Sequence, residues 1–433
     1  MYPSLYYFFK DIFGIDFQPL KMFQMFGCWV AIAFLVGGYF WTKELKRKEA
    51  NGLLSPTTAK VKKGGKLSTT DIVSSALLGF LIGYKLFYIV FNFHAFAENT
   101  QGFLLSTKGN FIGGIALAAI SVYLKYRDQE KERKKYPEVV WVDELIHPYQ
   151  HVGNMTLIAA FAGLAGAKIF HNLENWDQFM ADPMGAILSF DGLTMYGGLI
   201  LASCILIWYG KKNGLTTPHL IDSAAAPLMV GYGVGRIGCH MAGDGDWGIL
   251  NSAYISNPDG TVSAATPEQF QAALHSSNDL LREFGSIDNV HFASAHAPSW
   301  LPDWLFAFSY PHNVVNYGEP LAGCLDEKYC THLSPPVFPT PLYEVMMCLF
   351  LFGILWSIRK RITTPGVLFS LYLILNGIER FFIEKIRVNT LYNVNGFKFT
   401  QAELISTILF FLGVAGVFYF NRLEKRKQLT LDN

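Results

Sequence analysis

Long apolar runs recur along this chain, and they constrain its fold more than any other feature. A run of about 20 apolar residues can cross the hydrocarbon core of a bilayer, about 30 Å thick, as one helix. Lipid offers no partner to backbone N–H and C=O groups, so each run must pair these groups within itself. Because 51% of the 433 residues are hydrophobic and only 16% are charged, the sequence predicts an all-α polytopic membrane protein, a helical transmembrane bundle.

The number and orientation of the spans follow from hydropathy and charge. Lysine and arginine gather at 43–48, 125–137 and 422–427, whereas the segment 239–338 is rich in carboxylates. Basic connections stay in the cytoplasm, so we expect the N-terminus outside and the C-terminus inside. These clusters flank apolar helices and do not indicate nucleic-acid binding. About nine spans are predicted, at 22–41, 72–93, 111–125, 152–170, 193–209, 220–238, 341–357, 366–384 and 402–420.

The segments between and beside the spans complete the predicted organisation. The first residues carry many aromatic side chains and are expected to lie in the external interface. Cys324 and Cys330 would face an oxidising compartment, where they form either a disulfide or two free thiols. The predicted division is an interfacial segment 1–21, transmembrane helices 22–238, a small external cap 239–338, and C-terminal helices with a basic tail 339–427.

An internal repeat occurs among the predicted spans. ALLGFLIGYKLFY at 76–88 matches AAFAGLAGAKIFH at 159–171 in pattern, and FIGGI at 111–115 answers to MYGGLI at 195–200. We interpret this as a duplicated two-helix hairpin, about 71–125 and 152–209. Coincidence between two glycine-rich membrane helices is the alternative. The second copy has Tyr196 where the first copy has Ile112. We therefore expect the second copy to take part in the reaction and the first to have a structural role.

Several polar residues are predicted at the external third of the membrane. Two of them, Arg236 and Arg380, could clamp a phosphate, since a guanidinium is always charged and binds phosphate oxygens bidentately. A lipid headgroup supplies phosphate at that depth. Arg380 and Glu384 could instead form only an intrahelical ion pair, because they are four residues apart. The same depth is predicted for Tyr196 and Glu344.

The stretch VGYGVGRIGCHMAGDGDWG at 230–248 places an arginine at the end of an apolar helix and a carboxylate-rich loop after it. An ionisable residue at that depth predicts a functional site. Cys239, Asp244 and Gly248 follow Arg236 in this stretch. His240 is isolated among glycines, so a metal site, which needs more ligands, is not expected.

Four motifs together resemble the prolipoprotein diacylglyceryl transferase family. GRIGCHMAGDGDWG at 235–248 resembles the family signature, and MYGGLI at 195–200, PTPLYE at 339–344 and ERFFIEKIR at 379–387 resemble further elements in the family's order. The resemblance implies a monomeric, cofactor-free enzyme of the bacterial cytoplasmic (inner) membrane. It would transfer the diacylglyceryl group of phosphatidylglycerol to the lipobox cysteine thiol of a preprolipoprotein, forming a thioether and releasing glycerol phosphate. The first hairpin is additional to the family's usual seven spans.

The resemblance also implies roles for individual residues. Arg236 and Arg380 match the two phosphate-handling arginines, Asp244 the loop glutamate, and Glu344 and Glu384 the helix glutamates. Tyr196 replaces the usual histidine. We expect Asp244 or Glu384 to accept the thiol proton, because an unperturbed phenol with a pKa of about 10 is a poor base, and Tyr196 to orient the ester. The expected substrate-binding residues are Arg236, Arg380, Gly197, Gly198, Cys239 (the usual asparagine), Gly248 and Glu344.

Two other classes of function remain open from the sequence. One is a different phospholipid transferase that keeps the phosphate on its lipid product. The other is a transporter whose glycine-rich repeats move as two halves. The polar groups gather at one face of the membrane and not at its midplane, which argues against transport.

Overall fold

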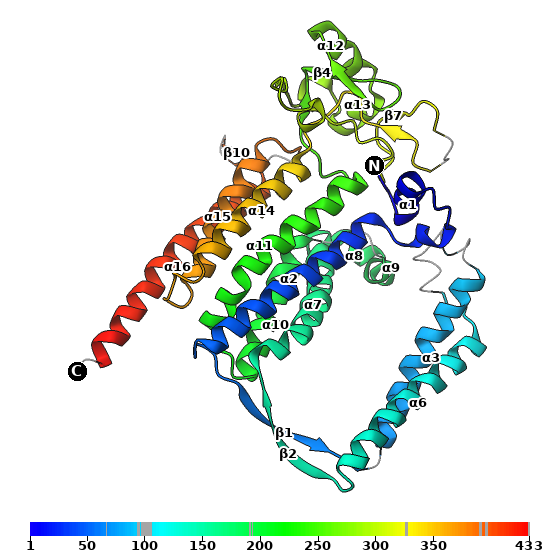
Figure 1. Ribbon diagram of the computed structural model, residues 1–433. Helices are drawn as coiled ribbons and strands as arrows, with labels where there is room; N and C mark the ends of the chain where they lie inside the picture. Colours follow the sequence, from blue (N-terminus) through cyan, green and yellow to red (C-terminus); the bar gives the residue numbers. More distant parts are fainter. Residues whose placement is uncertain are drawn as a thin grey trace. The chain divides into compact units, whose positions relative to one another are not determined.

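Helices make up most of the chain (Figure 1). The computed structural model describes residues 1–65, 67–92, 96, 106–189, 192, 194–324, 328–388, 392–394 and 397–431. Residues 93 and 193, at the ends of two predicted spans, and residues 325–327 of the predicted cap lie outside this set. The chain forms two compact units, residues 1–48 with 217–433 and residues 49–216.

A helix occupies each of the nine predicted ranges, with bounds that differ by a few residues at most ends. Five stretches in the described part of the chain are long and apolar enough to cross a membrane, namely α2, α3, α14, α16 and Pro148–Glu174, which contains α7. The class of helical membrane protein is therefore supported, and the count of nine spans stays a prediction. The helices are α2 (Met25–Ala50), α3 (Thr69–Phe91), α6 (Phe111–Lys135), α7 (Val152–Glu174), α10 (Met195–Lys212), α11 (Thr217–Ala242), α14 (Thr340–Ile358), α15 (Val367–Glu384) and α16 (Gln401–Leu431).

Two helix ends differ from the prediction for identifiable reasons. Helix α6 continues ten residues beyond 125 through a charged stretch, where lysine, glutamate and arginine are all good helix formers. Arg133 and Glu130 pair there at 3.5 Å. Helix α11 continues to Ala242 and ends where Gly243 adopts a φ of 62°, a left-handed conformation that favours glycine after a helix.

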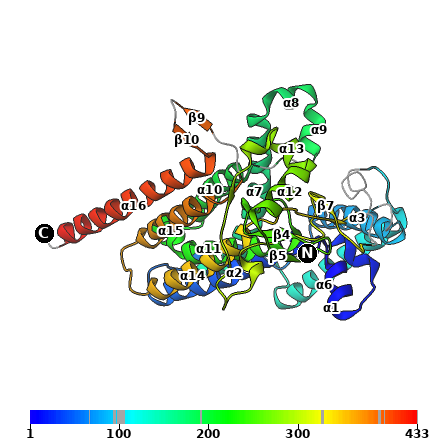
Figure 2. The same ribbon diagram turned by 90° about the horizontal axis from the view of Figure 1, so that it is seen from above.

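In the first unit, helices α11, α14, α15 and α16 pack side by side (Figures 1 and 2). Helix α2 packs on α11 through Ala33, Val230 and Val234. Two short elements precede α2 in the chain, the helix α1 (Leu5–Phe13) and a 3-10 turn (Gln18–Met22). The predicted interfacial segment therefore contains an aromatic helix. Its position in an interface stays a prediction.

At the opposite ends of these helices from Arg236, two buried carboxylates hold the helices together. Glu44 of α2 is buried and pairs with Arg47 and with Arg359, whose Nε lies 3.0 Å away. Asp222 of α11 accepts hydrogen bonds from the backbone N–H groups of Gly366 at 2.7 Å and Phe369 at 2.9 Å. A carboxylate at the N-terminus of α15 satisfies otherwise unpaired N–H groups, so α15 is held in register with α11.

The segment between α11 and α14 folds around a core of its own. Its buried residues include Leu250, Phe270, Leu274, Tyr310 and Val337. The elements are short: β3 (Leu250–Asn251), β4 (Tyr254–Ser256), β5 (Val262–Ala264), α12 (Pro267–Ser276), α13 (Asn278–Phe284), β6 (Phe292–Ala293), β7 (Glu319–Pro320) and β8 (Thr331–His332). The sequence predicted a small cap here without assigning its elements, and the segment contains short strands as well as helices. Its location outside the membrane stays a prediction.

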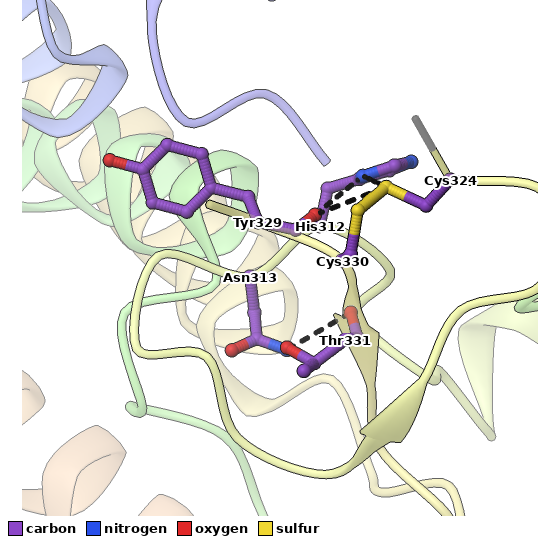
Figure 3. Close-up of a disulfide and its surroundings, with 6 residues drawn as sticks. All are labelled: His312, Asn313, Cys324, Tyr329, Cys330 and Thr331. Carbon is purple, nitrogen blue, oxygen red and sulfur yellow. Dashed lines mark hydrogen bonds between the residues drawn. A yellow bond between two sulfur atoms is a disulfide. The ribbon is translucent and has the colours of Figure 1, made fainter. Parts of the chain in front are cut away.

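Cys324 and Cys330 form a disulfide, with their Cα atoms 5.6 Å apart (Figure 3). The pairing decides between the two alternatives left open by the sequence. His312 lies beside the bond, and its Nδ1 is 2.7 Å from the backbone oxygen of Tyr329. Asn313 is fully buried and donates to the backbone oxygens of Tyr310 and Tyr317. Asn313 also donates to the backbone oxygen of Thr331 at 3.4 Å, so the chain next to Cys330 is tied to the core of the segment.

In the second unit, two hairpins share contacts at corresponding positions, which supports the proposed duplication. A Cβ on Gly83 would lie 2.3 Å from the backbone oxygen of Gly113, and one on Gly166 would lie 2.4 Å from that of Gly197. Both distances are too short for any side chain, so α3 with α6, and α7 with α10, touch backbone to backbone. Each hairpin also has a lysine that donates to a serine 21 residues later, Lys85 to Ser106 and Lys168 to Ser189.

We predict that Gly166→Val lowers the free energy of unfolding by about 1–3 kcal/mol, because an overpacked helix contact forces the two backbones apart. Gly163→Val is the matched control, since a Cβ there meets no atom within 4 Å. Thermal unfolding of the purified full chain measures both. Equal loss in the two variants would show that β-branching, and not the close contact with α10, sets the cost.

A two-stranded ribbon in the second unit was not expected from the sequence. Strands β1 (Thr57–Lys63) and β2 (Val140–Ile146) pair antiparallel, with Lys60 opposite Asp143. Lys63 also forms an ion pair of 3.0 Å with Glu144. The lysines of β1 mark the segment as a basic connection, and their alternation with valine and alanine is the signal for a strand. The fold is therefore predominantly helical, as predicted, and this ribbon is an addition to it.

Candidate active site

Arg236 and Arg380 come together at one buried carboxylate. Glu344, in the second turn of α14, is fully buried. Its Oε2 lies 2.9 Å from Nε of Arg236, at the C-terminal end of α11. Its Oε1 accepts a hydrogen bond of 2.9 Å from Nη1 of Arg380, in the last turn of α15. The predicted convergence of the two arginines thus occurs through an acidic residue between them.

Three further residues, Arg387, Asp246 and Glu384, complete this cluster. Arg387, just beyond α15, lies 3.6 Å from Oε1 of Glu344 through its Nη1. Asp246 pairs with both Arg236 and Arg387. Arg380 has a second partner, Glu384, whose Oε2 is 3.1 Å from its Nη2, so the intrahelical pair exists alongside the contact with Glu344. We call these six residues the arginine cluster: Arg236, Arg380, Arg387, Glu344, Glu384 and Asp246.

The arginine cluster is electrically balanced and almost entirely buried. Three guanidinium groups face three carboxylates. The side chains of Arg236, Arg380 and Arg387 are 10%, 14% and 7% exposed, and those of Glu344 and Glu384 are 0% exposed. Asp246 is different, because 35% of its side chain is exposed. The attraction between opposite charges is stronger where water is excluded. Asp246 is the member of this cluster that is most exposed to water.

Asp246 stays ionised in this setting. Burial raises its pKa, but the positive charges of Arg387 and Arg236 outweigh that effect and hold the pKa below its ordinary value. Tyr232 adds a neutral donor to the cluster, since its hydroxyl donates to Oε1 of Glu344 at 2.9 Å. The fully buried Glu344 therefore receives hydrogen bonds from a tyrosine and an arginine, and further positive charge from two more arginines.

Backbone contacts fix the loop that carries Asp246. The hydroxyl of Thr340 donates to the backbone oxygen of Asp246 at 3.1 Å. Two residues later, the N–H of Gly248 donates to the oxygen of Phe338 at 2.9 Å. A Cβ on Gly248 would lie 2.7 Å from the backbone oxygen of Ile386 and 2.8 Å from that of Phe338. Only glycine fits there, so Gly248 serves to bring the loop between the start of α14 and the chain beyond α15.

Asp244 lies apart from the arginines. Its Oδ1 accepts a hydrogen bond from the N–H of Asp246 at 3.3 Å, and no ion pair to it occurs in the part of the chain that the structure describes. Burial, followed by the charge of Asp246, raises the pKa of Asp244 above its ordinary value. Cys239 is buried, with Sγ 3.5 Å from Nη1 of Arg236.

One group of side chains could hold a cation. The potential ligand atoms of Cys239, Asp244 and Asp246 lie within 4.8 Å of one another. The sequence did not lead us to expect this grouping. Asp246 already pairs with two arginines, which leaves little negative charge for a metal. His240 is not part of this group, and its Nδ1 is 3.1 Å from the hydroxyl of Tyr310.

Tyr196, Gly197 and Gly198 form the first turn of α10 in the second unit. Both glycines are buried against α7, and a Cβ on Gly197 would lie 2.3 Å from Cβ of Phe170. Tyr196 is half-buried. The structure accounts for the two glycines as packing residues of the hairpin. A part for these three residues in the chemistry of the arginine cluster stays a prediction.

Sequence reasoning gave no role to several residues of the site. Arg387 follows Arg380 by seven residues and Tyr232 precedes Arg236 by four, spacings that place side chains on one helix face; this signal was available. Asp246 was given no role either, because the resemblance assigned the loop carboxylate to Asp244. Glu379 is also buried, and neither of its carboxyl oxygens has a hydrogen-bond partner among the described residues.

Comparison with known proteins places the chain in a family. The profile of the prolipoprotein diacylglyceryl transferase family matches residues 139–419. A phosphatidylglycerol–prolipoprotein diacylglyceryl transferase of Dehalococcoides mccartyi is 24% identical over 280 residues, which are 65% of this chain and 80% of the relative.

Relatives of the same name occur in other bacteria. The one from Lysinibacillus sphaericus is 24% identical, over 66% of this chain and 82% of its own. The one from Enterococcus faecalis is 22% identical, over 62% of this chain and 78% of its own. The matched region contains α7 to α15 and every member of the arginine cluster. This chain belongs to the prolipoprotein diacylglyceryl transferase family.

Proposed function

We propose that this chain transfers the diacylglyceryl group of phosphatidylglycerol to the lipobox cysteine thiol of a preprolipoprotein. The name of the relatives includes both the lipid donor and the protein acceptor. The family profile covers most of this chain. The observation that carries the proposal is the buried meeting of Arg236, Arg380 and Arg387 around Glu344. Guanidinium groups kept from water at one point suit the phosphate of a lipid headgroup.

The reaction makes one bond and breaks one. The thiolate sulfur attacks the glycerol carbon that bears the phosphate ester, the C–S bond forms, and the C–O bond breaks with its electron pair on the phosphate oxygen. Diacylglyceryl thioether and glycerol phosphate result. Negative charge on the leaving phosphate grows during the reaction, so preplaced guanidinium groups stabilise the transition state more than the substrate. Arg236 and Arg380 are the proposed catalytic arginines.

The thiol must lose a proton before or during attack, since the thiolate is the nucleophile. Asp244 is our first proposal for the acceptor, because its raised pKa makes its carboxylate a stronger base than an ordinary aspartate. Glu384 is the second proposal. Its Oε2 already pairs with Arg380 at 3.1 Å. Tyr196 would orient the ester.

The finer features of membrane placement are also proposals. We propose nine spans in the bacterial inner membrane, with the N-terminus outside, the C-terminus in the cytoplasm and the segment 239–338 as an external cap. The basic stretches 43–48 and 422–427 support this orientation. We also propose that the protein acts as a monomer, because one chain supplies all six residues of the arginine cluster.

An assay of the purified protein with a lipobox peptide, in the presence and absence of phosphatidylglycerol, tests the function. Mass spectrometry should detect a peptide heavier by one diacylglyceryl group only when the lipid is present, together with free glycerol phosphate. A lipid product that retains the phosphate would instead identify a headgroup transferase. Solute counterflow in liposomes without any thioether product would favour a transporter.

We predict that Cys239→Ser keeps transfer activity within about threefold of the unchanged protein, because direct attack by the substrate thiol needs no nucleophile from the enzyme. The serine hydroxyl replaces the thiol beside Arg236. The same peptide assay measures the rate. A folded but inactive variant would revive a covalent route through Cys239.

A further inference from the structure

Asp246 is the one member of the arginine cluster with substantial contact with water. Its side chain is 35% exposed, whereas Glu344 and Glu384 are 0% exposed. It pairs with two guanidinium groups at once, Arg236 and Arg387. A carboxylate between two guanidinium groups presents two oxygens in a fork, as the non-bridging oxygens of a phosphodiester do. The carboxylate and the phosphodiester each carry one negative charge.

We propose that the carboxylate of Asp246 occupies the position of the substrate phosphate between Arg236 and Arg387, and that the incoming phosphate displaces it. The inference rests on the proposed function, because it assumes a phosphate ligand. It specifies that function further, since it adds Arg387 to the anion-binding position beside Arg236, while Arg380 keeps its proposed catalytic role.

Burial determines which carboxylate can leave. Arg380 is held by Glu344 and Glu384, and neither carboxylate can turn to water from a site without exposure. Removing an ion from a buried pair without replacement costs several kcal/mol. At Asp246 the exchange takes place at the exposed edge and conserves charge, because one monoanion replaces another. The balance of three positive and three negative groups is kept while substrate is bound.

The loop allows this exchange by side-chain rotation alone. The backbone of Asp246 is tethered through its oxygen to Thr340, 3.1 Å away, and through its N–H to Asp244, 3.3 Å away. Gly245 precedes it with a φ of 99°, and a Cβ there would meet only Cγ1 of Val315, at 4.0 Å. The main chain therefore stays in place while the carboxylate turns toward water.

The displaced carboxylate would also assist product release. The leaving glycerol phosphate carries more negative charge than the substrate diester, so two bare guanidinium groups would hold it tightly. The displaced Asp246 stays ionised at neutral pH, because a carboxylate turned toward water has a pKa of about 4. It can then return and compete with the product for the same donors. An internal competitor lowers the apparent affinity for every anion at this position.

Calorimetric titration of glycerol phosphate into the full chain, reconstituted in phosphatidylcholine nanodiscs, tests the proposal. Asp246→Asn should bind glycerol phosphate about tenfold more tightly than the unchanged protein, equivalent to about 1.4 kcal/mol. The KM for phosphatidylglycerol should fall in parallel, and kcat should not rise. Glu268→Gln is the matched control, because it removes an exposed carboxylate in the first turn of α12; its affinity should be unchanged.

Two added variants make the result decisive. Arg387→Gln in the Asp246→Asn background should abolish the gain in affinity, and Asp246→Ser replaces Asp246→Asn if the amide prevents folding. Unchanged or weaker binding by folded position-246 variants that still make thioether would overturn the inference alone. Absence of thioether product from the unchanged protein would instead overturn the proposed function.

Discussion

Replacement of Arg236 or Arg380 by lysine should lower the rate of diacylglyceryl transfer by about two to three orders of magnitude, the loss typical when one oxyanion-stabilising donor is removed. Arg236 lies 2.9 Å from Glu344 and also contacts Asp246. Arg380 lies 2.9 Å from Glu344 and 3.1 Å from Glu384. A guanidinium reaches two acceptors through different nitrogens, whereas an ammonium is a point charge. Lysine keeps the charge and loses this geometry.

Turnover of radiolabelled phosphatidylglycerol with a lipobox peptide measures the effect. Arg282→Lys is the matched control, because its side chain is 87% exposed and its partner Asp279 is 3.8 Å away; its rate should be unchanged. Both variants must keep the thermal unfolding temperature near that of the unchanged protein for the comparison to concern chemistry. Near-normal turnover by folded Arg236→Lys and Arg380→Lys would refute a catalytic role for the arginines.

The two lysine variants should differ in how they lose activity. Arg236 belongs to the proposed anion position beside Arg387, so its replacement should raise the KM for phosphatidylglycerol as well as lower kcat. Arg380 contacts Glu344 and Glu384 and does not pair with Asp246, so its replacement should mainly lower kcat. A larger rise in KM for Arg380→Lys than for Arg236→Lys would move the phosphate position toward α15.

The helical part of the fold could be predicted because its cause is local. A run of apolar residues becomes a helix in lipid whatever its neighbours are, and a helix is found at all nine predicted ranges. The ends of α6 and α11 were missed because helix propensity and a single left-handed glycine decide them. The ribbon of β1 and β2 joins residues about 80 positions apart in the chain, and such pairing depends on partners that hydropathy does not identify.

The sequence predicted most residues of the site but not how they are arranged. An arginine at the end of an apolar helix is costly enough to indicate a function by itself, and this identified Arg236 and Arg380. The structure adds that Glu344 lies between them, fully buried. Hydropathy gives the depth of a residue and not its rotation about the helix axis. For the same reason the sequence led us to Asp244, whereas Asp246 is the loop aspartate that pairs with the arginines.

Glu344→Gln should destabilise the protein by about 3–5 kcal/mol, the usual cost when one partner is removed from a buried ion pair. Glu344 is 0% exposed and has Arg236, Arg380 and Arg387 within 3.6 Å. A glutamine keeps the shape and one carbonyl acceptor, but it leaves a net positive charge where water cannot reach. Chemical unfolding in detergent measures the loss, and Glu268→Gln in α12 is the control.

A compensating second change separates the stabilising role of Glu344 from its role in the reaction. Arg387→Gln removes one positive charge, so the double variant Glu344→Gln, Arg387→Gln should recover part of the lost stability. Transfer activity should stay low, because the arginines are no longer oriented by a common carboxylate and one of them is gone. If the double variant is no more stable than Glu344→Gln, charge balance is not what holds the cluster together, and hydrogen-bond geometry at Glu344 is the better explanation.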